Sequence, residues 1–326
     1  MTTAEMRDPT ESGPPFEWAG TRVAVLCNDA SGQGSDTADR ARPVLDALRA
    51  HGAEAPDLDE IPPTIPEQMD AARAGEPSVV VAVGGDGTIN AGARVAIDTA
   101  AALLLVPAGT MNLIAKDLAI PLGIEQQLLD LARLRACRID YASVNREVFL
   151  HSSAIGFVPH MAGLREDLRA SENALAWTRN AGRFLRGLFS VARRRVRFRT
   201  DRGEAERRTR SVLVTCNPLA DAGLGRHLRA SLDGGTLGLY ASSHSGPLAS
   251  VRLCMTFASG AFARDTETNC GSCGSLEIET GRPRVTVSND GELASLGAPL
   301  RYRVHPCELR VLVSPEGAAR IRGGAA

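Results

Sequence analysis

The sequence predicts an α/β domain, with a parallel sheet and flanking helices, followed by a β-rich domain. In the first half of the chain, the apolar runs 79–83 and 101–106 each end in a glycine-containing loop that leads into a helical segment. Such runs are typical of parallel strands buried on both faces. Residues 141–313 instead contain many short segments of alternating polarity, which indicates an antiparallel sheet. A chain of 326 residues, 44% of them hydrophobic, is long and apolar enough for two cores.

The termini and the charge exclude several classes of protein. Residues 1–20 are acidic, contain two prolines and lack an apolar run, so we expect a disordered tail rather than a secretory signal. We place the α/β domain at 21–140, the β-rich domain at 141–313 and a second flexible tail at 314–326. The net charge of -1 gives no overall attraction to nucleic acid. No segment reaches the roughly 20 apolar residues of a membrane-spanning helix, so we expect a cytoplasmic protein.

The cysteines favour a reducing compartment. There are seven of them, an odd number that is scattered along the chain, unlike the framework of a small disulfide-bonded protein. Cys270 and Cys273 form a single Cys-x-x-Cys pair without a second pair at zinc-finger spacing. We therefore interpret this pair as a loop feature rather than as a zinc or redox site.

Helix and strand patterns alternate along the first domain and give way to strands in the second. In the first domain, helices are predicted at 37–50, 67–75, after Thr88, after Asn112 through Leu118, and at 122–135. A first strand at 21–27 leads into a polar loop with Asn28, Ser31 and Gly32, which could contact a nucleotide. In the second domain, strands are predicted at 142–144, 147–153, 194–200, 211–216, 237–240, 276–278, 284–287, 301–304 and 309–313.

The segment 84–90, Gly-Gly-Asp-Gly-Thr-Ile-Asn, follows the apolar run 79–83. Its glycines, Gly84, Gly85 and Gly87, allow backbone N–H groups to approach an anion, and Thr88 is expected to cap the helix that contains Asn90. A carboxylate beside polyphosphate is repelled unless a cation lies between them or it takes up a proton. Asp86 therefore indicates Mg²⁺ coordination or a general base, and hence phosphoryl transfer.

A second loop, 107–112, follows the next strand in the same way and has the sequence Pro-Ala-Gly-Thr-Met-Asn. Ligands of open parallel sheets bind at the carboxyl ends of the strands, where neighbouring loops meet. We therefore expect both loops to serve one nucleotide site. Neither loop has the spacing of a P-loop or of the dinucleotide-binding fingerprint.

The first loop resembles the signature shared by diacylglycerol kinase catalytic domains, sphingosine kinases and, more distantly, NAD kinases and phosphofructokinases. The continuation Pro107-x-Gly-Thr-x-Asn-x-x-Ala-Lys-Asp-Leu-x-Ile-Pro121 resembles the second signature of bacterial diacylglycerol kinase-like proteins. The resemblance implies ATP and Mg²⁺ as cofactors, with Gly109, Thr110 and Asn112 at the nucleotide site. It also implies a β-sandwich second domain, a catalytic cleft between the domains, and a last strand that returns to the first domain.

Two positions depart from the family pattern. Many members have an acidic residue where Ala91 stands and an aspartate where Leu113 stands. Any metal or substrate contact that those side chains make in the family is therefore in question here.

Later motifs supply further candidates through the same resemblance. The family's late Asp-Gly-Glu matches Asp290 to Glu292 and makes Glu292, buried in the cleft, the candidate general base. Asp290 would orient it or replace it, and Asp86 is the competing base. Asp233, in an Asp-Gly dipeptide, is a candidate ligand of a structural cation or a hairpin-turn residue. His151 is expected to be a polar loop residue, and His227 and His244 are expected at the surface.

Residues 179–199 interleave arginines with aromatic and aliphatic residues. Such a helix can bind an anionic bilayer, which would place the protein at the inner face of the membrane beside a lipid substrate; a helix packed with a solvated arginine face is the alternative. Three functions compete: a lipid kinase, most simply of diacylglycerol; a kinase of a sphingoid or soluble acceptor; and a nucleotide-binding regulator without catalysis. A homodimer is a further candidate arrangement.

Overall fold

The computed structural model describes residues 14–28, 36–162, 178–180, 183, 192–220, 228–245, 248–259 and 265–323. The chain divides into two compact units. The first comprises the residues up to 139 together with 307–324, and the second comprises 140–306 and the last two residues. Both divisions fall inside strands, β4 (Arg135–Val144) and β15 (Leu300–Val313). The two strands therefore each contribute residues to both units.

The first unit contains a parallel sheet in the order β1-β2-β3-β15. The three first strands are β1 (Val23–Cys27), β2 (Val79–Gly84) and β3 (Ala102–Pro107). Val79 pairs with both Val23 and Ala102, and Arg310 of β15 pairs with Ala102. Every residue of β2 and β3 is buried, as expected for strands covered on both faces. The predicted fold class is confirmed.

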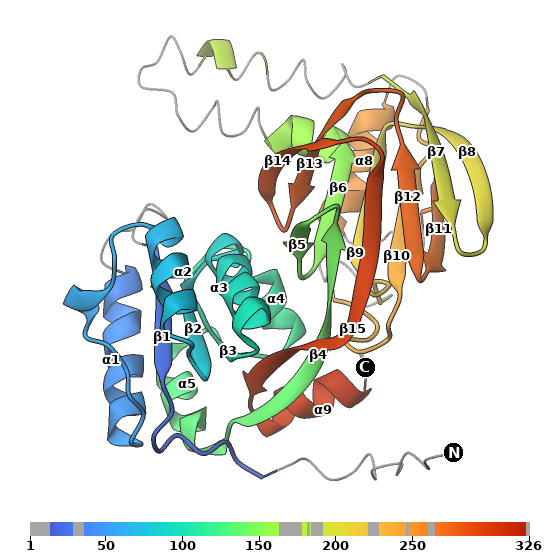
Figure 1. The fold of residues 1–326 in the computed structure, drawn as a ribbon. Coiled ribbons are helices and arrows are strands. Elements are labelled where there is room, and N and C mark those ends of the chain that lie inside the picture. Colours follow the sequence, from blue (N-terminus) through green and yellow to red (C-terminus); the bar gives the residue numbers. More distant parts are fainter. Residues whose placement is uncertain are drawn as a thin grey trace, which may run out of the picture. The chain divides into compact units, whose positions relative to one another are not determined.

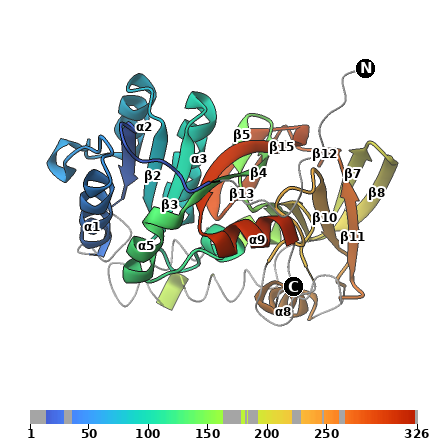
Figure 2. The same cartoon turned by 90° about the horizontal axis from the view of Figure 1, so that it is seen from below.

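Helices cover both faces of this sheet (Figures 1 and 2). One face carries α1 (Asp36–Ala50) and α5 (Ile124–Asp130), and the other carries α2 (Ile65–Ala74) and α3 (Asp86–Thr99). The remaining helical elements are η1 (Leu58–Glu60), α4 (Leu113–Asp117), η2 (Leu131–Arg133) and α9 (Pro315–Gly323). None of the helices among the described residues is long and apolar enough to cross a membrane.

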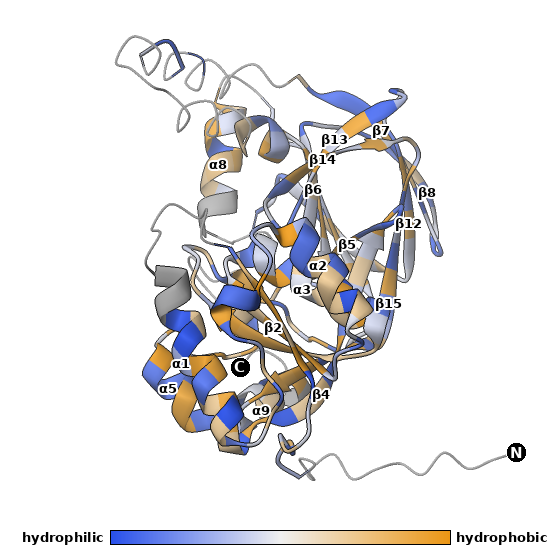
Figure 3. Ribbon diagram, turned by 60° about the vertical axis from the view of Figure 1, so that its left-hand side comes forward, coloured by the Kyte–Doolittle hydropathy of each residue, from blue (hydrophilic) through white to orange (hydrophobic). Residues whose placement is uncertain are grey.

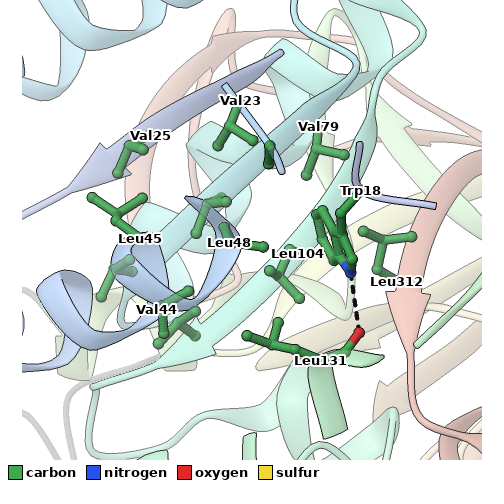
Figure 4. Packing of buried hydrophobic residues seen from close by; sticks show 14 of the residues in the cluster. Trp18, Val23, Val25, Val44, Leu45, Leu48, Val79, Leu104, Leu131 and Leu312 are labelled. Carbon is green, nitrogen blue, oxygen red and sulfur yellow. Dashed lines mark hydrogen bonds between the residues drawn. The ribbon is translucent and has the colours of Figure 1, made fainter. Parts of the chain in front are cut away.

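The core of the first unit includes residues that the sequence assigned to tails. Trp18 is buried against strand and helix residues such as Val79 and Leu48, and its Nε1 donates to the Leu131 carbonyl over 3.1 Å (Figure 4). The described part of the predicted 1–20 tail therefore packs onto the domain. The predicted tail at 314–326 is also wrong, because α9 forms there and buries Ala318 and Ile321.

The second unit is built from antiparallel strands in two sheets. One sheet has the order β11-β10-β9-β6-β13-β14, and the other contains β15-β12-β7-β8, with β4 pairing with β15 and with β5. The core between them includes Phe149, Val212 and Tyr302. The strands not yet given bounds are β5 (Glu147–Phe149), β6 (Ser152–Gly156), β7 (Arg194–Thr200), β8 (Gly203–Thr209), β9 (Ser211–Cys216), β10 (Leu237–Ser242), β11 (Thr268–Cys273), β12 (Ser275–Glu279), β13 (Arg284–Asn289) and β14 (Glu292–Gly297). A helix, α8 (Ala249–Ser259), follows β10.

Three strands were not predicted from the sequence, because they are exposed edge strands without alternating polar and apolar residues. In β8 six of the seven residues are exposed, whereas β2 is buried throughout, and Figure 3 shows the hydropathy difference. The others are β11 and β14. Cys270 and Cys273 lie in β11, in strand rather than loop, and no group of three or more His, Cys, Asp or Glu that could hold a metal occurs among the described residues.

Two further predictions are corrected. The helix predicted at 122–135 ends at Asp130 in a short 3-10 turn, after which β4 begins at Arg135. The two strands predicted at 301–304 and 309–313 are one strand, β15, despite Pro306. That continuity carries the chain from the second unit back into the sheet of the first.

Candidate functional site

The end of β1 is held by a side chain that sequence patterns did not single out. Gln68 of α2 accepts a hydrogen bond from the Cys27 amide over 2.9 Å and donates to the Cys27 carbonyl over 3.0 Å. This pair fixes the point at which the chain leaves the sheet toward Asn28. Ser31 and Gly32, the other candidates of this loop, lie outside the described residues.

The first glycine loop connects β2 directly to α3. Gly85 is the N-cap and Asp86 is the first helical residue, so the prediction that Thr88 caps the helix is wrong. Thr88 is buried instead against Gly84, where a Cβ would lie 2.5 Å from the Thr88 Oγ1. Because the N-cap has no side chain, the first N–H groups of α3 receive no side-chain cap. Free N–H groups at a helix start bind anions.

The second glycine loop lies directly against the first. A Cβ on Gly109 would approach the Gly85 Cα to 2.5 Å, and the Ala108 amide donates to the Gly84 carbonyl over 2.8 Å. Only glycine fits a contact this close between two backbones. The structure therefore brings together the two loops that the sequence assigned to one site. It also explains why residue 109 is glycine, whereas a Cβ on Gly85 would lie an ordinary 3.5 Å from the Gly109 Cα.

Asn112 closes the second loop on itself. Its Oδ1 accepts from the Gly109 amide over 3.1 Å, and its Nδ2 donates to the Gly109 carbonyl over 2.7 Å. The residue has φ of 47°, in the left-handed region that asparagine tolerates. Both functional atoms of the amide are thus engaged in shaping the loop, while Thr110 beside it is exposed. Asn90 is likewise engaged, because its Oδ1 accepts from Arg94 over 3.1 Å.

Asp290, an acidic candidate of the second unit, holds a neighbouring segment of backbone through its carboxylate. The Asp290 carboxylate accepts from the amides of Leu150, His151 and Ser152 over 2.6, 2.9 and 2.8 Å. Charge-assisted bonds of this kind are the stronger class of hydrogen bond. They hold the Asn289–Glu292 turn against the segment between β5 and β6, and they position Glu292 at the start of β14.

Glu292 itself is exposed, not buried as expected. Asp233 is also exposed and forms hydrogen bonds with Ser231 in a turn. The catalytic and metal-binding roles of these residues stay predictions.

A buried polar network in the second unit had no sequence signal. Arg229 is fully buried and donates to the carbonyls of Leu150 and Cys216 over 2.7 and 3.3 Å. Asp140, equally buried, accepts from the Asn217 side chain and the Gly235 amide. Burial, together with nearby carboxylates, raises the pKa of the Cys216 thiol to about 12, although Arg229 acts in the opposite direction. Cys216 is therefore a neutral core residue.

One of the three histidines interpreted from the sequence differs from its prediction. His244 is buried, with Nδ1 2.9 Å from the Ser242 hydroxyl and Nε2 3.2 Å from the Asp265 carboxylate. It therefore fastens the end of β10 internally instead of lying at the surface. His151 lies in the bend between β5 and β6, as expected of a loop residue, and is buried next to Asp290. His227 lies outside the described residues.

Comparison with known proteins supports the resemblance seen in the loops. Residues 22–144, which include both glycine loops, match the family model described as the diacylglycerol kinase catalytic domain. The chain also superposes on a protein from Bacillus anthracis str. Sterne provisionally named as a diacylglycerol kinase, with a TM-score of 0.65, 18% identity and coverage of 94% of this chain and 98% of that one. A diacylglycerol kinase structure from the same organism gives a TM-score of 0.60, 17% identity and coverage of 91% and 97%. Residues 22–144 are thus similar to the diacylglycerol kinase catalytic domain, and the chain has the fold of these bacterial proteins.

Proposed function

We propose that this protein is an ATP-dependent lipid kinase that transfers the γ-phosphate of Mg-ATP to a lipid hydroxyl, with diacylglycerol as the first candidate acceptor and phosphatidic acid as the product. The observation that carries the proposal is the contact between Gly85 and Gly109, within the segment that matches the family model. That contact forms a cradle of backbone amides beside the uncapped start of α3. A phosphate chain suits such a cradle.

The first unit supplies the nucleotide contacts in this proposal. The amides of the two glycine loops bind phosphate oxygens, and Asn112 keeps the second loop in shape. Asp86, at the first position of α3, is the residue that would hold Mg²⁺. One carboxylate suits this role, since Mg²⁺ is usually held by one or two carboxylates together with the substrate phosphates. When bound, Mg²⁺ would neutralise charge on the transferred phosphate.

The general base is proposed to be Glu292, with Asp86 as the alternative. A carboxylate can accept the proton of the acceptor hydroxyl as the new P–O bond forms. Asp290 acts as a positioning residue, because its carboxylate is bound by three backbone amides. The acceptor would be met at a membrane surface, and the segment 179–199 proposed for that contact lies largely outside the described residues.

The direct test is transfer of label from γ-labelled ATP to a panel of detergent-dispersed lipids and water-soluble alcohols, with and without Mg²⁺. The proposal expects labelled phosphatidic acid from diacylglycerol and no label on soluble alcohols. Equal labelling of a soluble diol would support a kinase of soluble acceptors instead. Absence of any ATP binding would contradict both kinase assignments.

Two substitutions test the residue roles. Asp86→Asn and Glu292→Gln should each lower kcat by about 100-fold or more, in the range typical of lost acid–base catalysis. Asp98→Asn, on the same helix as Asp86, and Glu125→Gln, an exposed glutamate, serve as matched controls. ATP affinity should fall for Asp86→Asn and stay constant for Glu292→Gln. Full activity in Glu292→Gln would show that Glu292 is not the general base and would favour Asp86 in that role.

A further inference from the structure

The second unit holds a cavity of about 640 Å³ at one end of its two sheets. Ile155 of β6 and Val212 of β9 come from the six-stranded sheet, and Val196 of β7 comes from the other sheet. The cavity lies where β6 ends and where β7, β9 and β13 begin. Its volume is in the range of cavities that bind small molecules.

The charged residues in the described lining of this cavity all have one sign. None of its described lining residues is acidic, and five are arginines: Arg183, Arg194, Arg210, Arg282 and Arg284. Arg284 donates to the hydroxyl and carbonyl of Ser295, which are neutral. Arg194 and Arg282 make no hydrogen bond or ion pair through their side chains within the described part of the chain. Other arginines of the same sheets are paired with carboxylates, as Arg199 is with Glu277 and Glu279.

The inner wall of the cavity is apolar. Ile155, Val196 and Val212 are buried, and Val285 and Leu293 are half-buried at the edge. A small inorganic anion would leave these apolar side chains without a partner, and an uncharged lipid would leave Arg194 and Arg282 without a charged one. The lining therefore complements a molecule that carries both an aliphatic chain and a negative charge.

We propose that this cavity binds an anionic amphiphile: a phosphate-bearing lipid whose acyl chain contacts the apolar wall and whose phosphate is bound by Arg194, Arg282 and Arg284. The guanidinium group matches phosphate oxygens in a paired, two-bond geometry. A cationic amphiphile is disfavoured, because its charge would lie among arginines without an acidic residue in the described lining. This binding requires neither nucleotide nor turnover, so it is independent of the proposed kinase activity.

Calorimetric titration with three ligands tests separately whether binding needs the aliphatic chain and whether it needs the phosphate. The full-length protein is titrated, without nucleotide, with 1-oleoyl-lysophosphatidic acid below its micelle concentration, with oleoylglycerol, and with glycerol 3-phosphate. The second ligand has the chain without the phosphate, and the third has the phosphate without the chain. The proposal expects lysophosphatidic acid to bind at least about tenfold more tightly than oleoylglycerol or glycerol 3-phosphate. Its affinity should fall as the salt concentration rises. Equal binding of oleoylglycerol or of glycerol 3-phosphate would overturn it.

Variants then locate the binding in the cavity. The double variant Arg194→Gln/Arg282→Gln should weaken binding of lysophosphatidic acid by about tenfold or more. Arg195→Gln is the matched control, since Arg195 lies on the same strand, pairs with Glu206 over 2.9 Å and does not line the cavity. Leu293→Asp introduces a negative charge at the edge and should abolish binding. Thermal melting checks that each variant is folded. Unchanged affinity in the double variant, or an equal loss in Arg195→Gln, would contradict the assignment.

Discussion

The glycine loops of the first unit and the acidic turn of the second are held in opposite ways. Each glycine loop follows directly from its own strand, and Asn112 closes the second loop on Gly109 only three residues away. The acidic turn depends on Asp290, whose carboxylate binds amides 138 to 140 residues earlier in the chain. A motif of the first kind can be read from adjacent residues. The role of a residue such as Asp290 can be seen only in the folded chain, because its hydrogen-bond partners are distant in sequence.

This difference leads to a division between stability and ligand binding. Side chains held over long sequence distances should mainly affect the free energy of unfolding when they are changed. Residues of the glycine loops should mainly affect nucleotide affinity and turnover. Three substitutions test that division and a fourth tests a local hydrogen bond, from the largest expected effect to the smallest.

Trp18→Ala should lower the free energy of unfolding by about 4 kcal/mol, because it empties a large buried site and removes the hydrogen bond to Leu131. Urea denaturation that follows the unfolding of the first unit measures this loss. Phe16→Ala, at a partly buried neighbour, should cost clearly less. A change below about 1 kcal/mol for Trp18→Ala would mean that the segment before β1 does not contribute to the core.

Asp290→Asn should cost about 3 kcal/mol of unfolding free energy, since charge-assisted bonds to three amides are weakened and an amide donor is placed among other donors. The expected loss appears in chemical denaturation of the second unit. Asp233→Asn, at an exposed turn, is the control and should be near neutral. Loss of turnover without loss of stability would show instead that Asp290 takes part in the reaction.

Gly109→Ala should reduce kcat/KM for ATP by about 100-fold, because the added Cβ separates the two loops from their close contact. Gly123→Ala is the matched control, since a Cβ there meets no atom within 4 Å. Far-ultraviolet circular dichroism should be unchanged in both variants. If Gly109→Ala bound ATP normally, the loop contact would not belong to the nucleotide site.

Thr268→Val should have the smallest effect, about 1 kcal/mol near pH 7. Burial alone would raise the pKa of the Asp265 carboxyl, but hydrogen bonds from Thr268 and the Glu267 amide, with the charge of His244, hold that pKa below its ordinary value of 3.8. A carboxyl with a lowered pKa contributes stability above its unfolded pKa and loses it as pH falls through the folded pKa. The difference between wild type and Thr268→Val should therefore shrink below about pH 4. A difference that grows on acidification would contradict the role given to Asp265.

The limits of sequence analysis follow the same division. Strands β2 and β3, both glycine loops and the parallel arrangement were predictable, because continuous apolar runs and glycine spacing are local signals. The N-cap was misassigned to Thr88 because the preference of threonine for that position competes with the steric demand of Gly84, which only coordinates reveal. The edge strand β8 was missed because exposed strands lack an apolar period.

The sequence by itself determined the α/β domain, the paired glycine loops and the family to which they point, since each is encoded by residues close together in the chain. The tertiary structure decided the packing of Trp18 and α9, the burial of Arg229 and His244, and the use of Asp290 as a clamp. The physical reason is that burial of a polar or terminal residue depends on partners far away in sequence. A buried charge is stable only where the fold brings such partners to it.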